Sequence, residues 1–370
     1  MQDLDRTDRR YLYFMGVATT TLIFLIFTIF LAYRAGFSNF FTRLRGIIFP
    51  RVNQVIYIPR SISDELDSLG AVIGNVPGRP SHPPHDTILA EPDERLEFKL
   101  KPNADISAFV LKSTAAFNFD PPVFYIKRGA KLSGGLADYI KKASRLEYSC
   151  STDSNGFRKT LPPVSSEEKI LIIGDSVAFG VGVDDRHTIA SRLQEIVGGR
   201  FEVINAGIGD YDSRRVLRLA KELGVSGRYS SLIYVACQND FMWSSGRSKS
   251  DWVREARDVL SGLREISGSF NNNIVVFLHT YMEYCLRDIF CEKGWRREWI
   301  EKTDLLREEL PEICYGMGFK YGDWTDVAGD FEKENKGIFS GFALYADHCH
   351  LSPLGNKLAA DKISGLIKER

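Results

Sequence analysis

Apolar and polar positions follow a regular pattern along the second half of the chain. Short runs rich in Val, Ile and Leu are typical of β-strands that are covered on both faces. They predict strands at residues 169–173, 201–205, 232–236, 274–278 and around Lys320. Between them lie amphipathic segments with apolar residues at helical spacing, most clearly at residues 251–266. Strands that alternate with helices predict a parallel sheet, and therefore an α/β fold.

A single long apolar run lies near the N-terminus. Residues 11–33 carry no charged side chain over 23 positions, and Arg9, Arg10 and Arg34 flank them. This length is enough to cross a bilayer, so we predict a single N-terminal transmembrane anchor. A cleaved signal peptide and a buried helix are the alternatives, but the run is long for a signal peptide and lacks a small-residue cleavage site. The arginines on its two sides do not decide its orientation.

The segment between the anchor and the predicted sheet has two kinds of composition. Residues 76–92 are rich in proline and show no pattern, which predicts a linker. Short alternating runs at residues 95–163 predict the strands of a small β-containing elaboration. We therefore divide the chain into a cytoplasmic tip and anchor at 1–34, a juxtamembrane segment and linker at 35–94, the elaboration at 95–168 and the α/β domain at 169–370.

Composition limits the possible partners and compartments. The 370 residues include 48 Lys and Arg and 48 Asp and Glu, so no basic field favours a nucleic-acid partner. Of six cysteines, Cys285 and Cys291 have a spacing that could close a small disulfide outside the cytosol. We expect a membrane protein whose α/β domain lies on the periplasmic side, with a reduced cytosolic protein as the alternative.

The clearest candidate for chemistry is the turn that ends the first predicted strand. Four apolar residues at 170–173 lead directly into Gly174, Asp175 and Ser176. Open α/β sheets hold their sites at the carboxyl ends of their strands, so Ser176 is a candidate nucleophile. The alternative is a strand-to-helix turn with a serine cap, or a loop that cradles a phosphate.

A second candidate lies just before the predicted C-terminal helix, which Ser352 and Pro353 are suited to begin. Asp347 precedes His350 by three residues, and in a tight turn these positions share a side. The carboxylate could then hold one ring nitrogen of His350 and leave the other for Ser176. A surface pair before a capped helix is the alternative. Three other histidines are weaker candidates for the base: His187, His279 and His348.

These motifs together resemble the GDSL or SGNH hydrolase family. The resemblance rests on Gly174-Asp175-Ser176, Asn239-Asp240 and Asp347-x-x-His350, and it covers residue 169 to the end. It implies a flavodoxin-like three-layer α/β/α fold, serine attack on an ester, and no metal or organic cofactor. Two positions depart from the family pattern, because Cys237 replaces a glycine and Asp210 occupies another glycine's place.

The resemblance also implies a role for each residue. Ser176 is expected as the nucleophile, His350 as the general base and Asp347 as the residue that orients it. Three sets of donors are expected to form the oxyanion hole: the main-chain N–H of Ser176, that of Gly209 or Asp210, and the side chain of Asn239.

We therefore expect a membrane-tethered serine esterase that cleaves an O-acyl ester, such as an acetyl group on an envelope glycan. An O-acyltransferase that acts on a cell-surface polysaccharide with the same three residues is the nearest alternative. A flavodoxin-like module that binds a phosphate-bearing ligand is an alternative of another class.

Overall fold

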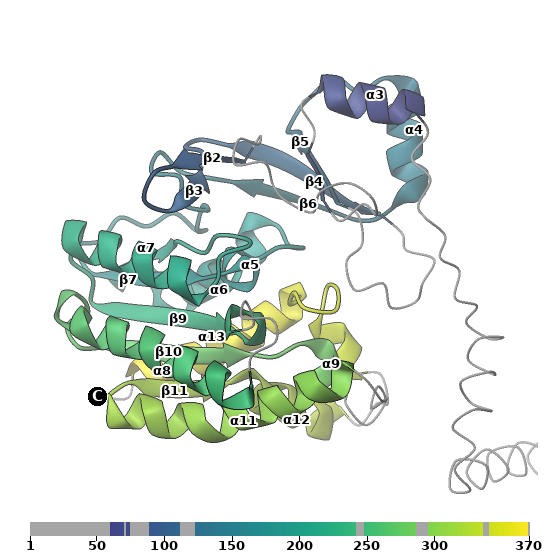
Figure 1. Cartoon of the computed structure of the whole chain (residues 1–370). Helices are drawn as coiled ribbons and strands as arrows, with labels where there is room; N and C mark the ends of the chain where they lie inside the picture. The colour runs from purple at the N-terminus through teal and green to yellow at the C-terminus, as the bar shows by residue number, and fades with distance from the viewer. Residues whose placement is uncertain are drawn as a thin grey trace, which may run out of the picture. The chain divides into compact units, whose positions relative to one another are not determined.

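The computed structural model describes residues 60–69, 72–74, 89–111, 123–241, 248–285, 295–335 and 340–368 (Figure 1). One compact unit takes in all of these residues. Within these ranges no helix is both long and apolar enough to span a membrane. The predicted anchor at residues 11–33 lies outside the described residues.

The central sheet has five parallel strands. They are β7 (Lys169–Gly174), β8 (Glu202–Asn205), β9 (Ser231–Cys237), β10 (Ile274–His279) and β11 (Lys320–Asp323). Their order across the sheet is β8-β7-β9-β10-β11, and every neighbouring pair is parallel. Counted along the chain this is the order 2-1-3-4-5, which is flavodoxin-like. The predicted parallel-sheet α/β fold is confirmed.

Helices cover both faces of this sheet (Figure 1). All seven residues of β9 are buried, and alternate residues enter two separate apolar clusters. Leu232, Tyr234 and Ala236 pack with one layer of helices: α7 (Ser213–Ser226), α8 (Lys249–Glu265) and α11 (Trp295–Gly316). The residues between them pack with the other layer: α6 (Ile189–Val197), α12 (Trp324–Asn335) and α13 (Pro353–Lys368). The sheet is therefore the middle of three layers.

A second, antiparallel sheet precedes the central one in the chain. Its strands are β1 (Val72–Gly74), β4 (Asp105–Leu111), β5 (Val123–Lys127) and β6 (Ser144–Ser151), in the order β1-β5-β4-β6. Two helices, α3 (Arg60–Ser68) and α4 (Gly134–Ala143), contribute Leu66 and Leu136 to an apolar cluster with Phe124 of β5.

This part of the structure begins earlier than the predicted elaboration. A hairpin of β2 (Ala90–Asp93) and β3 (Glu97–Leu100) spans the predicted boundary between residues 94 and 95. Helix α3 and strand β1 also lie within residues 35–94, the predicted juxtamembrane segment and linker. These elements have only three to nine residues, and Pro92 lies inside β2, so their apolar pattern is too short to read from the sequence.

Short elements connect the strands and helices. They are α5 (Ser176–Phe179), α9 (Met282–Cys285) and five 3₁₀ turns: η1 (Asp185–His187), η2 (Gly198–Arg200), η3 (Gln238–Phe241), η4 (Ser267–Phe270) and η5 (Ser340–Leu344). Both α5 and η3 directly follow a strand of the central sheet.

Candidate active site

The turn after β7 has a backbone shape that requires glycine. Gly174 has a φ of 150°, and a Cβ at this position would lie 2.5 Å from the carbonyl oxygen of Val235. Asp175 follows as the N-cap of α5, and its Oδ1 accepts a hydrogen bond from the Val177 N–H at 2.8 Å. Ser176 is the first residue of α5 and stays partly exposed, while the next three residues are buried.

The position of this turn follows from the strand order. The chain leaves β7 for β8 on one side of the sheet and then crosses back to β9 on the other side. Such a switch point opens a crevice at the carboxyl ends of the two central strands. Ser176 follows β7 and Asn239 follows β9, so the sheet brings these two side chains to the same crevice.

The loop before α13 brings an acid and a histidine to the serine. His350 Nδ1 lies 2.8 Å from Asp347 Oδ2, and His350 Nε2 lies 2.9 Å from Ser176 Oγ. A carboxylate only accepts, so Nδ1 carries the proton and donates it, which leaves Nε2 to accept from the serine hydroxyl. Asp347, His350 and Ser176 thus form one hydrogen-bonded row across 174 positions of sequence.

The same loop is closed by its own backbone. The N–H groups of Cys349 and His350 both donate to Asp347 Oδ1 at 2.8 Å. Tyr345 and Leu351 form a β-bridge across the loop. The carboxylate therefore fixes the loop with one oxygen and the imidazole with the other, so the position of His350 depends on a few local contacts.

The charges of the acid and the histidine support one another. Burial alone would raise the pKa of Asp347, but the nearby His350 and the hydrogen bonds from it hold that pKa well below its usual range. Burial alone would lower the pKa of His350, but the effect of the Asp347 carboxylate is larger and raises that pKa above its usual value. This carboxylate therefore favours the imidazolium that forms when His350 takes a proton.

Besides Ser176, the residues predicted as oxyanion donors lie on two loops of the crevice, one after β8 and one after β9. A Cβ built on Gly209 would lie 3.9 Å from the Cβ of Ser176, so the Gly209 backbone is next to the serine. Asp210 follows with a left-handed backbone, at a φ of 65°, and its side chain is exposed. The side chain of Asn239 hydrogen-bonds the Asp175 carboxylate, which ties η3 to the serine turn.

Two buried carboxyl groups support these loops. Burial raises the pKa of Asp175 and raises that of Asp240 well above its usual range. Asp240 Oδ2 accepts from the Tyr234 hydroxyl at 2.7 Å and from the Cys237 N–H at 3.1 Å. These bonds hold the start of η3 against β9, and so position Asn239.

The three alternative histidines are placed differently from His350. His348 Nδ1 is 3.8 Å from Asp347 Oδ1, which is too long for a hydrogen bond. His279 is buried at the end of β10, and burial lowers its pKa to about 3, so its ring is neutral. His187 lies in η1 and lines a neighbouring pocket. In the described part of the chain, His350 is the histidine that hydrogen-bonds Ser176.

A buried arginine that the sequence does not reveal supports the serine turn. Arg158 is 1 % exposed and donates to the carbonyl oxygens of Phe179, Gly180 and Val183 at 2.9, 2.6 and 2.6 Å. Its Nε donates to Asp185 at 3.1 Å. The arginine thus binds the end of α5 and the loop that follows it. The only signal in the sequence is an arginine beside an Asn-Gly turn, which equally fits an exposed hairpin.

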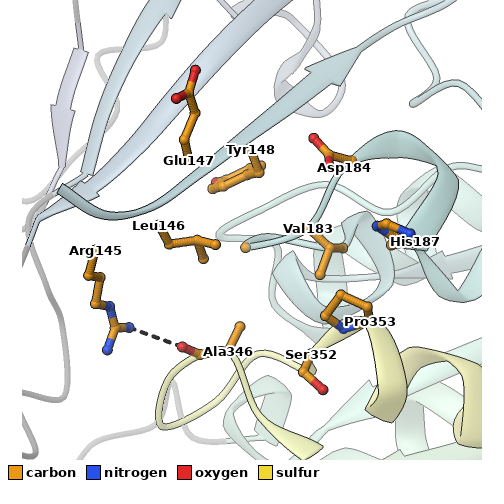
Figure 2. Close-up of a pocket in the computed structure, with 11 residues that line it drawn as sticks. Arg145, Leu146, Glu147, Tyr148, Val183, Asp184, His187, Ala346, Ser352 and Pro353 are labelled. Carbon is orange, nitrogen blue, oxygen red and sulfur yellow. Dashed lines mark hydrogen bonds between the residues drawn. The ribbon is translucent and has the colours of Figure 1, made fainter. Parts of the chain in front are cut away.

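A pocket of about 300 Å³ lies beside the loop that carries Asp347 (Figure 2). Residues of β6, including Leu146 and Tyr148, form one wall, and Val183 and His187 lie opposite. Ala346, which directly precedes Asp347, lines the pocket too, and its carbonyl oxygen accepts from Arg145 at 3.1 Å. The antiparallel sheet therefore shapes a cavity next to the acid.

The described cysteines are free thiols. Cys285 contacts the hydroxyl groups of Thr280 and Tyr345 at 3.4 and 3.1 Å and takes part in no disulfide; Cys291 lies outside the described residues. In the part of the chain that the structure describes, one group of side chains is close enough to hold a metal ion, namely Cys237, His279 and Cys349.

Comparison with known proteins gives distant similarities. The chain matches no protein-family model and no curated protein. It is similar to the structure of a lipolytic G-D-S-L family member from Veillonella parvula, at 15 % identity over 56 % of this chain and 100 % of that one, with a TM-score of 0.43. It is also similar to the structure of an acetyl xylan esterase, at 17 % identity over 54 % of this chain and 99 % of that one, with a TM-score of 0.42. A third similar structure is a psychrotrophic esterase from Pseudoalteromonas sp., at 17 % identity over 55 % of this chain and 97 % of that one, with a TM-score of 0.39. Similarity this distant carries no conclusion about the reaction, which must come from the site.

Proposed function

We propose that this chain is a serine esterase that hydrolyses an O-acyl ester with Ser176, His350 and Asp347. The observation that carries the proposal is the unbroken hydrogen-bonded row from Asp347 through His350 to Ser176 Oγ, at 2.8 and 2.9 Å. A serine hydroxyl is a weak nucleophile unless an adjacent base takes its proton, and this row supplies that base and the group that orients it.

The reaction follows from the placement of the protons. Ser176 Oγ attacks the carbonyl carbon of the ester while its proton passes to His350 Nε2. His350 then gives that proton to the leaving alcohol, which departs and leaves an acyl group on Ser176. Water then attacks the acyl group on Ser176 while His350 takes a proton from the water. His350 returns that proton to Ser176 Oγ, and the carboxylic acid is released. Asp347 keeps its charge throughout and stabilises the imidazolium.

The negative oxygen that forms during attack needs donors already in place. Gly209 lies next to Ser176, and Asn239 hydrogen-bonds the neighbouring Asp175. These positions support the main-chain N–H of Gly209 and the side chain of Asn239 as oxyanion donors, together with the main-chain N–H of Ser176. An asparagine amide has two N–H donors, so Asn239 can bind Asp175 with one and the oxyanion with the other. The main-chain N–H of Asp210, which follows Gly209 directly, is the alternative donor to that of Gly209.

We extend the proposal to an acylated glycan at a membrane. The pocket next to Ala346 supports a large alcohol portion, because it lies beside the site and is lined by both polar and apolar side chains. The uncharged run at residues 11–33 supports a tether, which suits a substrate fixed at the cell surface on the periplasmic side. The acyl group is proposed as an acetyl group.

A covalent probe tests the nucleophile directly. Full-length protein treated with a fluorophosphonate should gain the probe's mass on Ser176, and Ser176→Ala should lose both labelling and hydrolysis of an aryl acetate. Loss of the nucleophile is expected to lower kcat by about 10,000-fold or more. Ser107→Ala, on β4 of the antiparallel sheet, is the matched control and should keep both. Labelling of another residue, or unchanged hydrolysis by Ser176→Ala, would show that the proposal is wrong.

A second measurement separates hydrolysis from acyl transfer. An O-acyltransferase would pass the acyl group from Ser176 to a sugar hydroxyl instead of water. Release of acetate should be unchanged when an unacetylated oligosaccharide is added, if the chain is a hydrolase. Appearance of acetylated oligosaccharide at the expense of acetate would instead identify a transferase with the same nucleophile.

A further inference from the structure

Three side chains of types that can bind a metal ion lie close together next to the proposed active site, although they are distant in sequence. Cys237 ends β9, His279 ends β10, and Cys349 directly precedes His350. One potential ligand atom from each lies within 4.8 Å of the other two. Cys237 and His279 are paired in register on neighbouring parallel strands, so their side chains share a face of the sheet. The sheet thus supplies two of the donors and the loop before α13 supplies the third.

The two ring nitrogens of His279 differ in their contacts. His279 Nε2 hydrogen-bonds the carbonyl oxygen of Cys349 at 2.7 Å, and because a carbonyl only accepts, Nε2 carries the proton. A metal-bound histidine usually donates its second ring N–H to a carbonyl or carboxylate in this way. Nδ1 therefore carries a lone pair and no proton, and it is buried without a hydrogen-bond partner among the described residues. A buried acceptor without a partner is costly, and a metal ion would satisfy it.

The neighbouring aromatic side chains cannot fill this need. Trp324 and Tyr345 lie 6.1 and 6.2 Å from the His279 ring, measured between centroids. Their polar hydrogens are used elsewhere, since Trp324 Nε1 donates to the Tyr345 hydroxyl and that hydroxyl donates to the Thr280 carbonyl oxygen. The side chain of Tyr281 hydrogen-bonds the Cys349 side chain, so its phenol oxygen lies next to this cysteine.

We propose that Cys237, His279 and Cys349 bind one zinc ion with a structural role. Zinc favours thiolate and imidazole ligands, and its bond lengths put two tetrahedral sulfur ligands ~3.8 Å apart, within the spacing of this cluster. Binding would replace the two thiol protons, which leave to solvent, and the two thiolates would balance the charge of Zn²⁺. A neutral centre suits a site in which the three side chains are 0, 0 and 3 % exposed.

The zinc ion would join two loops of the active site. Cys237 lies two residues before Asn239, and Cys349 lies one residue before His350. A metal bonded to both would hold the end of β9 and the loop before α13 together. The family resemblance implies no metal, so this site is a feature of this chain's own residues. It follows from the cysteines at positions 237 and 349.

Metal content measures this proposal without reference to activity. Full-length protein from zinc-supplemented culture, purified without a metal-affinity column, should hold one zinc ion per chain, as measured by inductively coupled plasma mass spectrometry. Cys237→Ser and Cys349→Ser should each lose that zinc. Cys150→Ser is the matched control, because Cys150 is also fully buried but lies on β6, outside the cluster, and it should keep the zinc.

A second measurement uses the unaltered protein, so it does not depend on whether the variants fold. A thiol-reactive mercurial should release one zinc ion per chain as it modifies Cys237 and Cys349. Wild-type protein without zinc would overturn the proposal, as would a mass spectrum that shows Cys237 and Cys349 joined in a disulfide. Retention of zinc by both Cys237→Ser and Cys349→Ser would also overturn it.

Discussion

The parallel and antiparallel sheets contribute to the candidate site in different ways. The parallel sheet and its loops supply every side chain of the hydrogen-bonded row, since Ser176 follows β7 and the loop of Asp347 and His350 leads into α13. Downstream of the antiparallel sheet, Arg158 pairs through its backbone with Thr152 on one side and with Asn205 of β8 on the other. The first region supplies the proposed catalytic side chains, and Arg158 supports the turn that carries Ser176.

This difference shows two ways of placing a residue. In the parallel sheet, position follows from topology, because the strands end at one edge and the switch point brings β7 and β9 together. Arg158 is positioned by polar contacts, because its guanidinium donates to four carbonyl oxygens and one carboxylate in a buried space. Substitutions in the hydrogen-bonded row should therefore lower kcat, whereas substitution of Arg158 should lower the free energy of unfolding.

The largest expected effect is on the rate, from Asp347→Asn. The amide would still fill the space, but it would favour the wrong tautomer of His350 and would not stabilise the imidazolium. We expect kcat for an aryl acetate to fall by about 1,000- to 10,000-fold. Asp105→Asn, which breaks the exposed pair with Arg128 on the antiparallel sheet, is the matched control and should keep the wild-type rate. A loss smaller than tenfold in Asp347→Asn would mean that the acid does not orient the base.

The largest expected effect on stability comes from Arg158→Ala. Removal of the guanidinium leaves the Asp185 carboxylate, which is 8 % exposed, without its cation. Breaking a buried pair in this way costs about 3–5 kcal/mol in the free energy of unfolding, which denaturant titration would measure. Arg128→Ala removes an exposed arginine of the same region and should cost less than about 1 kcal/mol. Equal losses in the two variants would show that the buried contacts do not support the turn.

The sequence predicts the parallel sheet because its signals are local. Each strand is an uninterrupted apolar run, and β9 keeps this pattern over all seven residues. The spacing of Asp347 and His350 is also local, since three residues in a tight turn are enough to bring their side chains together. The place of Ser176 at a strand end follows from the run before it and from Gly174, whose φ of 150° suits glycine.

The residues that the sequence does not reveal depend on distant partners. Nothing near Arg158 marks it as buried, because its carboxylate partner is 27 residues away and its other partners are backbone carbonyl oxygens. Cys237 and Cys349 likewise meet only when β9 and the last loop are in place. Elements as short as β1 and β2, with three and four residues, hold too few positions to show a period.

A smaller loss of rate is expected from Asn239→Ala, which tests whether the second strand end shares the chemistry. Removal of one oxyanion donor costs about 100- to 1,000-fold in kcat, with little change in KM, since the donor binds the transition state more strongly than the substrate. Asn155→Ala, in the turn before Arg158, removes a similar amide from an exposed position and should leave both constants unchanged. A rise in KM at constant kcat in Asn239→Ala would assign Asn239 to substrate binding instead.

The smallest expected effect comes from an exposed ion pair, in contrast to the buried pair of Arg158 and Asp185. Glu97 of β3 pairs with Arg215 and Arg218 of α7, and these contacts lower its pKa although its side chain is 42 % exposed. Exposed pairs are screened, so Glu97→Gln should cost only ~0.2–1 kcal/mol in the free energy of unfolding. A lowered carboxyl pKa stabilises the folded state above the unfolded pKa of about 4.3. The difference between wild type and Glu97→Gln should therefore be present at neutral pH, and it should be lost as the pH falls from that value through the lowered pKa of the folded state. A difference that persists in acid would assign the effect to packing of the hairpin, and not to charge.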